Sequence, residues 1–530
     1  MRNCIKLITT LILFSQYPLL AQQHEIIFQQ CYGGSLLEIA VDIIKTEVGF
    51  VALATTGSHD GDVPPHYPES VSYWLFEVDE TGNIIWGHTY GGSGIDEAVK
   101  LLKTNDNGYL LFGYTSSFDG DVSGNHGMFD VWIIKTDSIG EMEWQRCYGG
   151  SQEEYAHDII QTIDGGYIFT ASAWSTDGDV GGGSPGFDAW LCKINAEGEI
   201  EWSQVFGGLF RDMGGHIIQT TDGGYMLTAQ AYSPEVCPNA VPGANSDTWL
   251  LKLDASGEIE WQQCYGGSHD EFGGSIVQTL DGGYAFATPT RSNDGDVSGC
   301  MGIPGDPQSS SLWFVKTDAN GYIEWQRCLG GYGRDSGRIY GLTEEGNYLL
   351  GGSTTHSSGD VSCNNIVPGK SSIWVFELSN EGEILWQSCF GSSDNDFLGR
   401  MKYYNPSNFL FIAMTRSATQ DVDCLLQGNY DTWVVEFEHL GVSLADLPLK
   451  TTGKIIFPNP ATTHTWLQLP DNLPLATMYI ELYSPTGSLL YRAQPTGQFH
   501  KIEVAYLPRG LYLVRVWDGE KWLVEKLVVQ

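Results

Sequence analysis

The chain has 530 residues and a formal net charge of -38 at pH 7, although only 17% of its residues are charged. The acidity therefore comes from a shortage of Lys and Arg and not from long acidic runs. A surface of this sign repels the phosphates of nucleic acids, which excludes a nucleic-acid partner. The 65 glycines predict frequent tight turns.

The N-terminus has the features of a secretory signal peptide, which we assign to residues 1–21. Arg2 and Lys6 supply positive charge, residues 7–14 are mostly apolar, and the small residue Ala21 ends the segment. A membrane anchor is the alternative, but the apolar run is too short to span a hydrocarbon core of about 30 Å. We find no other transmembrane segment. The sequence therefore predicts an exported protein, secreted or held at the outer-membrane surface, after cleavage of the signal peptide.

A unit of about sixty residues then recurs seven times, and periods of this length are typical of repeat architectures. Each unit carries a Gly-Gly pair (Gly-Ser in the last) and two aromatic markers. The first marker is Trp74, Trp132, Trp190, Trp249, Trp313, Trp374 and Trp433. The second is Phe28, Trp86, Trp144, Trp202, Trp261, Trp325 and Trp386. We expect the tryptophans to pack one unit against the next.

The second unit shows how one repeat folds. Four β-rich runs, separated by Gly, Asp and Asn turns, occupy residues 96–104, 109–116, 130–137 and 141–150. Short runs of this kind predict an antiparallel meander of four strands. No stretch has sustained helical periodicity, so the sequence predicts an all-β protein.

Seven units of four strands predict a seven-bladed β-propeller over residues 24–438. A superhelical solenoid is the alternative. The ends of the array favour a ring, because a fourth-strand sequence at residues 25–34 precedes the first unit and the last unit lacks one. We expect this N-terminal strand to complete the last blade and so hide both sheet edges.

The turn before each fourth strand follows the pattern D-x-x-G-x-x-x-W, as in "KTDSIGEMEW". It resembles the tryptophan-docking repeat of pyrroloquinoline-quinone propellers and, more loosely, the Asp-box hairpin of sialidases. The resemblance covers one hairpin per blade, so it supports the fold and implies no activity.

A linker, residues 439–453, leads to a different domain at residues 454–530. This domain carries Pro458-Asn459-Pro460-Ala461, then Gly510 and Tyr512 in "LPRGLY", then Lys526 in the terminal "KLVV". Together these motifs resemble the type A C-terminal sorting domain of the type IX secretion system of Bacteroidetes. The turn "SPTG" departs from the Asp that the family more often has. The resemblance implies a small Ig-like β-sandwich and passage across the outer membrane with the type IX machinery as partner; an ordinary Ig-like accessory domain is the alternative. The repeat body also resembles repeat regions of Bacteroidetes secreted proteins.

An acidic residue follows each Gly-Gly pair, at the turn that enters the innermost strand near the mouth of the propeller channel. The set is Glu38, Asp96, Glu154, Asp212, Glu271, Asp335 and Asp396. Because every blade has one, we expect a structural role, in which the carboxylate accepts backbone N–H bonds. A ring that concentrates cations is the alternative.

Two loops between second and third strands match the oxygen-ligand spacing of calcium loops. Their candidate ligands are Asp119, Asp121, Ser123 and Asp130 in one loop and Asp177, Asp179 and Asp188 in the other. Calcium is the one cofactor that the sequence suggests. In the alternative, the Asp before each third strand caps a turn, because Asp247 and Asp431 hold that place without an upstream Asp-Gly-Asp.

Ten cysteines follow the signal peptide, and an exported protein can keep disulfides. In four units a cysteine in the loop between second and third strands faces one at the end of the fourth strand. We expect Cys237–Cys264, Cys300–Cys328, Cys363–Cys389 and, across the ring closure, Cys31–Cys424. Cys147 and Cys192 would stay thiols; fully reduced cysteines are the alternative.

The sequence contains none of the Ser/His/Asp, zinc-protease or phosphate-loop motifs that would identify an enzyme. His126, His157 and His216 are isolated and are expected on the surface or in the channel. The near-equivalence of the blades favours a binding or structural surface protein, with a glycan or protein ligand on the face of the long loops. A secreted hydrolase or lyase with unlike residues in the channel mouth is the alternative.

Overall fold

The computed structural model describes residues 24–439 with gaps at 68, 184–185, 238–244, 303–305, 307–308, 364–365 and 406–407. Of the C-terminal part it describes residues 456–457, 463–469, 479–483, 489–495, 499–505, 507, 510–517 and 522–529. The predicted signal peptide, residues 440–453 of the predicted linker and Pro458 to Ala461 lie outside the described residues. The chain divides into two compact units, with the boundary between Leu440 and Gly441.

The first unit is built from antiparallel sheets of four strands, seven of them in the described part of residues 24–439. We call each sheet a blade and number the blades along the chain. Blades 1 to 3 are β2 (Glu38–Lys45), β3 (Gly49–Thr56), β4 (Ser72–Asp79), β5 (Ile84–Tyr90); β6 (Asp96–Lys103), β7 (Tyr109–Thr115), β8 (Asp130–Thr136), β9 (Met142–Tyr148); and β10 (Glu154–Gln161), β11 (Tyr167–Ala173), β12 (Asp188–Ile194), β13 (Ile200–Phe206).

Blades 4 to 6 continue the pattern. They are β14 (Asp212–Gln219), β15 (Tyr225–Ala231), β16 (Asp247–Leu253), β17 (Ile259–Tyr265); β18 (Ser275–Gln278), β19 (Tyr284–Thr290), β20 (Ser311–Thr317), β21 (Ile323–Leu329); and β22 (Ser336–Leu342), β23 (Tyr348–Thr354), β24 (Ser372–Leu378), β25 (Ile384–Phe390). The described residues form no helix, and accordingly none of them belongs to a helix that could cross a membrane.

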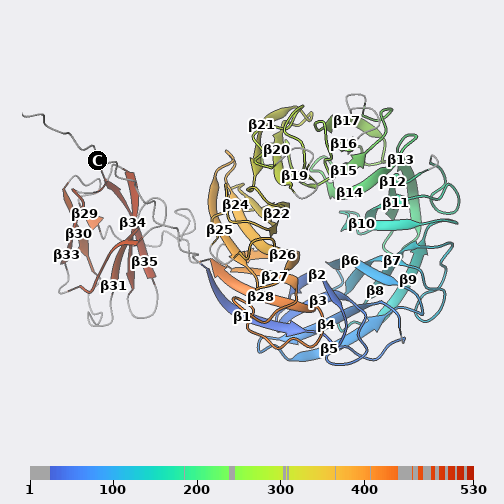
Figure 1. The fold of residues 1–530 in the computed structure, drawn as a ribbon, viewed down its shortest axis with the longest axis horizontal. Helices are drawn as coiled ribbons and strands as arrows, with labels where there is room; N and C mark the ends of the chain where they lie inside the picture. Colours follow the sequence, from blue (N-terminus) through green and yellow to red (C-terminus); the bar gives the residue numbers. More distant parts are fainter. Residues whose placement is uncertain are drawn as a thin grey trace, which may run out of the picture. The chain divides into compact units, whose positions relative to one another are not determined.

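Blade 7 joins the two ends of the unit. It contains β26 (Phe397–Asn405), β27 (Asn408–Thr415), β28 (Asp431–His439) and, as its outer strand, β1 (His24–Tyr32). β1 pairs antiparallel with β28, with Cys31 opposite Trp433. In Figure 1 the sheets follow one another around a common centre like the blades of a propeller, with the first strand of each nearest the centre.

The middle strands of each blade are buried because every blade is covered by a neighbour on both faces. All residues of β3, β11 and β15 are buried, and so are all residues of β8, β12 and β16. Adjacent blades share one apolar core: Phe112 of blade 2 packs against Phe169 of blade 3, with ring centroids 5.7 Å apart. The continuous apolar runs of these strands follow from this two-sided burial.

The third-strand tryptophans are at most 1% exposed. Most donate their indole N–H to a glutamine on the fourth strand, over 2.6–3.1 Å. These pairs are Trp132–Gln145, Trp249–Gln262, Trp313–Gln326, Trp374–Gln387 and Trp433–Gln29. In blade 1 glycine stands at the glutamine position, as Gly87, and the indole nitrogen of Trp74 has no hydrogen-bond partner among the described residues.

The fourth-strand tryptophans pack one blade against the next, as the sequence predicts. Five of the six contact the aromatic residue that begins the second strand of the following blade: Trp86, Trp202, Trp261, Trp325 and Trp386. The ring centroids of Trp202 and Tyr225 are 6.2 Å apart, and those of Trp386 and Phe409 are 5.2 Å apart.

Disulfides join the four cysteine pairs that the sequence analysis proposes. They are Cys31–Cys424, Cys237–Cys264, Cys300–Cys328 and Cys363–Cys389. Cys147 and Cys192 are buried thiols. The first disulfide ties β1 to the long loop of blade 7. Lys45 of blade 1 also forms a 3.0 Å ion pair with Glu436 of β28.

The second unit contains two antiparallel sheets that share one apolar core. One sheet has β29 (Ile456–Phe457), β30 (His464–Gln468) and β33 (Phe499–Glu503), and the other has β31 (Tyr479–Tyr483), β32 (Leu489–Ala493), β34 (Gly510–Trp517) and β35 (Trp522–Val529). Of the motif residues, Gly510 begins β34, Tyr512 is buried in the core, and Lys526 lies opposite Leu513.

The lengths of the chain segments closed by the disulfides predict unequal contributions to stability. Cys31 and Cys424 are 393 residues apart, whereas Cys237 and Cys264 are 27 apart. On the chain-entropy model, the double variant C31S/C424S should lose about 2 kcal/mol more free energy of unfolding than C237S/C264S. Denaturant unfolding of both variants measures the difference, and a smaller loss for C31S/C424S would contradict it.

Candidate functional site

The seven carboxylates after the Gly-Gly pairs are wholly buried, with no exposed surface. Each accepts the backbone N–H of the second residue of the pair over 2.6–3.1 Å. A hydroxyl from the end of the second strand adds to the bond in several blades, as from Thr56 to Glu38 at 2.9 Å. Their surroundings are those of a structural turn, and a cation in solvent has no access to them.

Six of the seven pairs have glycine at the second position, where the loop backbone passes close to it, and the last pair has Ser392. A Cβ on Gly92 would lie 2.4 Å from the carbonyl oxygen of Asp119, and one on Gly34 would lie 2.5 Å from that of Asp60. Backbone atoms cannot yield as a flexible side chain can. In blades such as 1 and 2 the turn and the long loop therefore fit only with glycine between them.

The aspartates of the Asp-Gly-Asp motifs bind the same turn. Asp121 accepts the N–H of Gly91 at 3.0 Å, and Asp119 accepts that of Ser93 at 2.7 Å. Asp179 and Asp177 repeat these bonds in the next blade, with Gly149 and Ser151 as donors. Three consecutive N–H groups of the turn thus each meet a carboxylate.

The remaining candidate calcium ligands also have other contacts. Asp130 accepts the N–H of His126 at 2.9 Å and lies 2.7 Å from the His126 ring nitrogen Nδ1. Ser123 accepts a bond from Gln145, and Asp188 is buried at the start of β12. Across the described residues, no three His, Cys, Asp or Glu side chains come together as a metal ion would require. Calcium binding stays a prediction.

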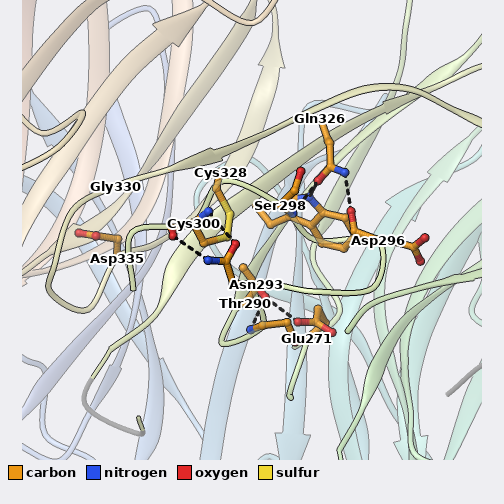
Figure 2. Close-up of a disulfide and its surroundings, with 12 residues drawn as sticks. Glu271, Thr290, Asn293, Asp296, Ser298, Cys300, Gln326, Cys328, Gly330 and Asp335 are labelled. Carbon is orange, nitrogen blue, oxygen red and sulfur yellow. Dashed lines mark hydrogen bonds between the residues drawn. A yellow bond between two sulfur atoms is a disulfide. The ribbon is translucent and has the colours of Figure 1, made fainter. Parts of the chain in front are cut away.

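Figure 2 shows the corresponding region of blade 5, where the Cys300–Cys328 disulfide closes the long loop against the fourth strand. Behind it, Glu271 accepts the hydroxyl of Thr290 at 2.5 Å. Asn293 binds the backbone of Cys300 on both sides, as donor at 3.2 Å and as acceptor at 3.3 Å. The described part of the loop is therefore held at its base.

A cavity of about 430 Å³ lies where the inner strands of blades 3 to 7 meet. Its lining includes Met213, the second residue of β14, and Ser336, the first residue of β22. It also includes their partners on the neighbouring strands, Gln230 and Ser353. These positions are next to the Gly-Gly turns. The cavity therefore lies at the end of the channel that faces the long loops.

One position of the inner strand, directly before a buried apolar residue, carries a different type of residue from blade to blade. These residues lie along the channel. We call them the axial ring: Asp42, Lys100, Asp158, His216, Ser275, Arg338 and Arg400. The shorter members bind the backbone of the next inner strand. Asp158 accepts the N–H of Ile217 at 3.0 Å, and Ser275 accepts that of Ile339 at 2.7 Å.

Ion pairs neutralise both carboxylates of the axial ring. Asp158 bonds to Lys100 at 2.6 Å and lies 3.4 Å from His216, and Asp42 lies 3.3 Å from Lys402. Burial alone would raise the pKa of Asp158, but the ammonium group of Lys100 outweighs it and holds that pKa well below its usual range. Burial lowers the pKa of His216 to about 4, so the imidazole is neutral at pH 7.

Arg338 and Arg400 also line the cavity, but they lack such partners. Within the described part of the chain, neither guanidinium group has a hydrogen bond or an ion pair. Arg338 is exposed and Arg400 is half-buried. The two cations are therefore held beside one another facing the same space.

Five aromatic side chains cluster on the long-loop face of blades 2 and 3. We call them the aromatic patch: Tyr114, Phe129, Tyr155, Trp174 and Phe187. Trp174 is 47% exposed, and neighbouring rings have centroids 5.1–5.8 Å apart. Tyr155 lies two residues before His157, which lines the cavity, so the patch borders the cavity.

The sequence analysis did not identify the axial ring or the aromatic patch. It placed His157 and His216 in the channel or on the surface, and the structure places both in the channel lining. His126 lies instead in the long loop of blade 2 beside Asp130. A sequence signal for the axial ring does exist, because this is a position where neighbouring repeats carry residues of opposite charge.

Comparisons with known proteins identify the C-terminal unit. Residues 455–530 match the family described as the secretion system C-terminal sorting domain. The match confirms the sorting domain that the sequence motifs predict, and it indicates secretion by the type IX system. No curated protein matches the chain.

Solved structures with some similarity include PorZ, a surface component of the type IX secretion system of Porphyromonas gingivalis. It is 10% identical with a TM-score of 0.41, and the match covers 92% of this chain and 59% of PorZ. The BBS1N–ARL6DN complex gives 8% identity, 81% and 98% coverage and a TM-score of 0.42. A family PL25 ulvan lyase is 10% identical with a TM-score of 0.36, and the match covers 67% of this chain and 78% of the lyase. Similarity at this level carries no argument about function.

The buried turn carboxylates predict a stability that falls as pH rises. Burial raises the pKa of Glu271 to about 7 and that of Asp396 to about 6, above their values in an unfolded chain. The folded state therefore binds more protons between about pH 4 and pH 7, and the free energy of unfolding decreases with rising pH in that window. Thermal melting should occur at a higher temperature at pH 5 than at pH 8.

The Glu271→Gln variant tests the cause. The amide keeps the hydrogen-bonding shape and has no charge, so the pH dependence should weaken by on the order of 2 kcal/mol. An exposed glutamate, Glu80, gives the matched control Glu80→Gln, which should change nothing. An unchanged pH profile in Glu271→Gln would contradict the assignment.

Proposed function

We propose that the protein is a secreted or surface-held binding propeller that takes a glycan on its long-loop face. The observation that carries this proposal is the aromatic patch, which borders the axial cavity and leaves Trp174 half-exposed. The sorting domain supports an extracellular site of action.

The binding face depends on the architecture that we infer for the first unit, a seven-bladed propeller closed by β1. Support comes from the β1–β28 pairing, the Cys31–Cys424 disulfide and the Trp433–Gln29 hydrogen bond. Blade 7 also shares an apolar core with blade 1, through residues such as Ile412 and Ala52. We infer in the same way that the two C-terminal sheets form a small β-sandwich.

Exposed aromatic rings suit a glycan because a flat ring stacks on the apolar face of a sugar while polar groups beside it bind hydroxyls. The patch has such groups: Tyr114 donates its hydroxyl to Glu97 at 2.5 Å, and Tyr155 donates to Glu153 at 3.1 Å. Arg211 lies over the ring of Phe187, 5.5 Å from its centroid. Clusters of exposed apolar side chains rimmed by polar groups mark interaction sites.

The cavity chemistry favours binding over the hydrolase or lyase alternative. A glycosidase needs a carboxylic acid that is protonated near neutral pH and can reach the substrate. Asp158, the carboxylate that lines the cavity, is ion-paired and its pKa is lowered. The acids with raised pKa values, such as Glu271, are buried within the turns.

For export, we infer that the signal peptide at residues 1–21 directs the chain to the periplasm. Residues 455–530 then direct it to the type IX machinery. The propeller then acts outside the cell or on its surface. The two steps use opposite ends of the chain.

Replacing Trp174 should test the glycan face. Trp174→Ala removes the most exposed ring of the patch, and we expect binding to glycans selected on an array to weaken by about ten-fold or more. Trp144→Phe, an outer-strand change away from the patch, is the control and should bind normally. Unchanged affinity in Trp174→Ala, with an unchanged melting temperature, would contradict the proposed site.

Deleting residues 455–530 should stop export at the periplasm in a host with a type IX system. The physical reason is that the machinery recognises the folded C-terminal unit and not the propeller. Cell fractionation and surface labelling measure the distribution. A reporter fused to residues 455–530 is the control and should reach the surface; normal display of the truncated chain would refute the assignment.

A further inference from the structure

The axial channel carries positive charge in a strongly acidic protein. The chain has a formal net charge of -38 and only 27 Lys and Arg residues. Four of these lie close enough in the channel to influence one another electrostatically: Lys100, Arg338, Arg400 and Lys402. The carboxylates of Asp158 and Asp42 pair with Lys100 and Lys402. The group has a formal excess of two positive charges, opposite in sign to the molecule.

Elsewhere the same chain neutralises its buried cations fully. Four third-strand lysines, each at most 6% exposed at the side chain, lie within 2.7–3.0 Å of two carboxylates apiece. They are Lys135 with Asp106 and Glu143, Lys193 with Asp164 and Glu201, Lys252 with Asp222 and Glu260, and Lys316 with Asp281 and Glu324. The channel arginines have no such carboxylate partners, and they differ also in burial, because Arg338 is exposed and Arg400 is half-buried.

We propose that Arg338 and Arg400 form an anion site in the axial cavity, which binds the carboxylate or sulfate group of an acidic sugar. The ligand class rests on the glycan-binding function proposed above. The planar guanidinium group donates two parallel N–H bonds to a carboxylate or sulfate. A bound anion also reduces the repulsion between the two arginines.

The position of the site explains how it would select a ligand. The cavity volume of about 430 Å³ lies within the range of small-molecule sites. It borders the aromatic patch, so a sugar stacked on the patch can direct an acidic group into the channel. Lys100 and Lys402 are occupied by Asp158 and Asp42, which leaves the arginines as the groups free to bind. The patch supplies affinity for sugar rings, and the arginines supply the preference for charge.

Titration of the full-length protein tests the proposal with three probes at constant ionic strength. The probes are inorganic sulfate, a sulfated uronic-acid tetrasaccharide and a neutral tetrasaccharide. Wild-type protein should bind sulfate saturably and the acidic tetrasaccharide more tightly than the neutral one. Arg338→Gln and Arg400→Gln should each weaken the acidic ligand about ten-fold or more and leave the neutral ligand unchanged.

The controls separate this site from the glycan face and from folding. Arg146→Gln removes the same charge from an exposed outer strand, where Arg146 pairs with Glu199, and should not affect any probe. Because Arg338 has no partner to lose, Arg338→Gln should melt at the same or a higher temperature than wild type.

The possible results are distinguishable. Equal binding of acidic and neutral sugars, unaffected by Arg338→Gln and Arg400→Gln, would overturn the anion site and leave the glycan function standing. Saturable sulfate binding that depends on Arg338, without binding of any sugar, would support the anion site and refute the glycan ligand. Absence of saturable sulfate binding, or a marked fall in the melting temperature of Arg338→Gln, would overturn the anion site.

Discussion

A buried carboxylate that holds the turn between successive blades is the interaction on which the rest of the first unit depends. In each blade the acid accepts the N–H of the second turn residue, as Asp96 does from Gly92 at 2.8 Å. Aspartates of the long loop bind the N–H groups on either side where the Asp-Gly-Asp motif occurs. One turn therefore fixes both the entry to the inner strand, which lines the channel, and the base of the long loop, which belongs to the proposed binding face. The desolvation of these acids is a cost repeated in every blade, and the raised pKa values reflect it.

The sequence predicts well the features that recur from unit to unit. The third-strand tryptophans and the turn carboxylates recur in every unit, and the paired cysteines recur in four units. Their packing, hydrogen-bonding and covalent roles can therefore be inferred by comparing the units. The calcium interpretation shows the limit of this reasoning. Asp119 and Asp121 have a ligand-like spacing because a tight loop must bring several oxygen atoms together, but in the structure these oxygens meet backbone N–H groups. Spacing alone does not say whether a loop's oxygens bind a metal ion or the protein's own amides.

The residues of the channel were not predicted, because a comparison of repeats for their shared residues passes over the positions at which the repeats differ. Lys100, Asp158 and Arg338 occupy equivalent places in three blades, and each looks like an ordinary exposed residue of a strand when its unit is considered alone. Only closure of the sheets around one axis brings them together, so their interaction is a property of the whole array. The aromatic patch was not predicted for a similar reason. Tyr114 and Tyr155 belong to different blades, and their rings come into contact only because blade 2 packs against blade 3.

The pairing of β1 with β28 also sets the order in which the first unit can fold. Strands within blades 1 to 6 are neighbours in sequence and can pair as soon as they exist, whereas Cys31 and Cys424 are 393 residues apart. Contacts of such long range form late because the intervening chain must first lose its freedom. Until residues 431–439 are present, β1 has no partner and its hydrogen-bonding edge is open to other chains. A product truncated before β28 therefore keeps an unpaired strand at its front, which gives the cell a means to distinguish incomplete chains from finished ones.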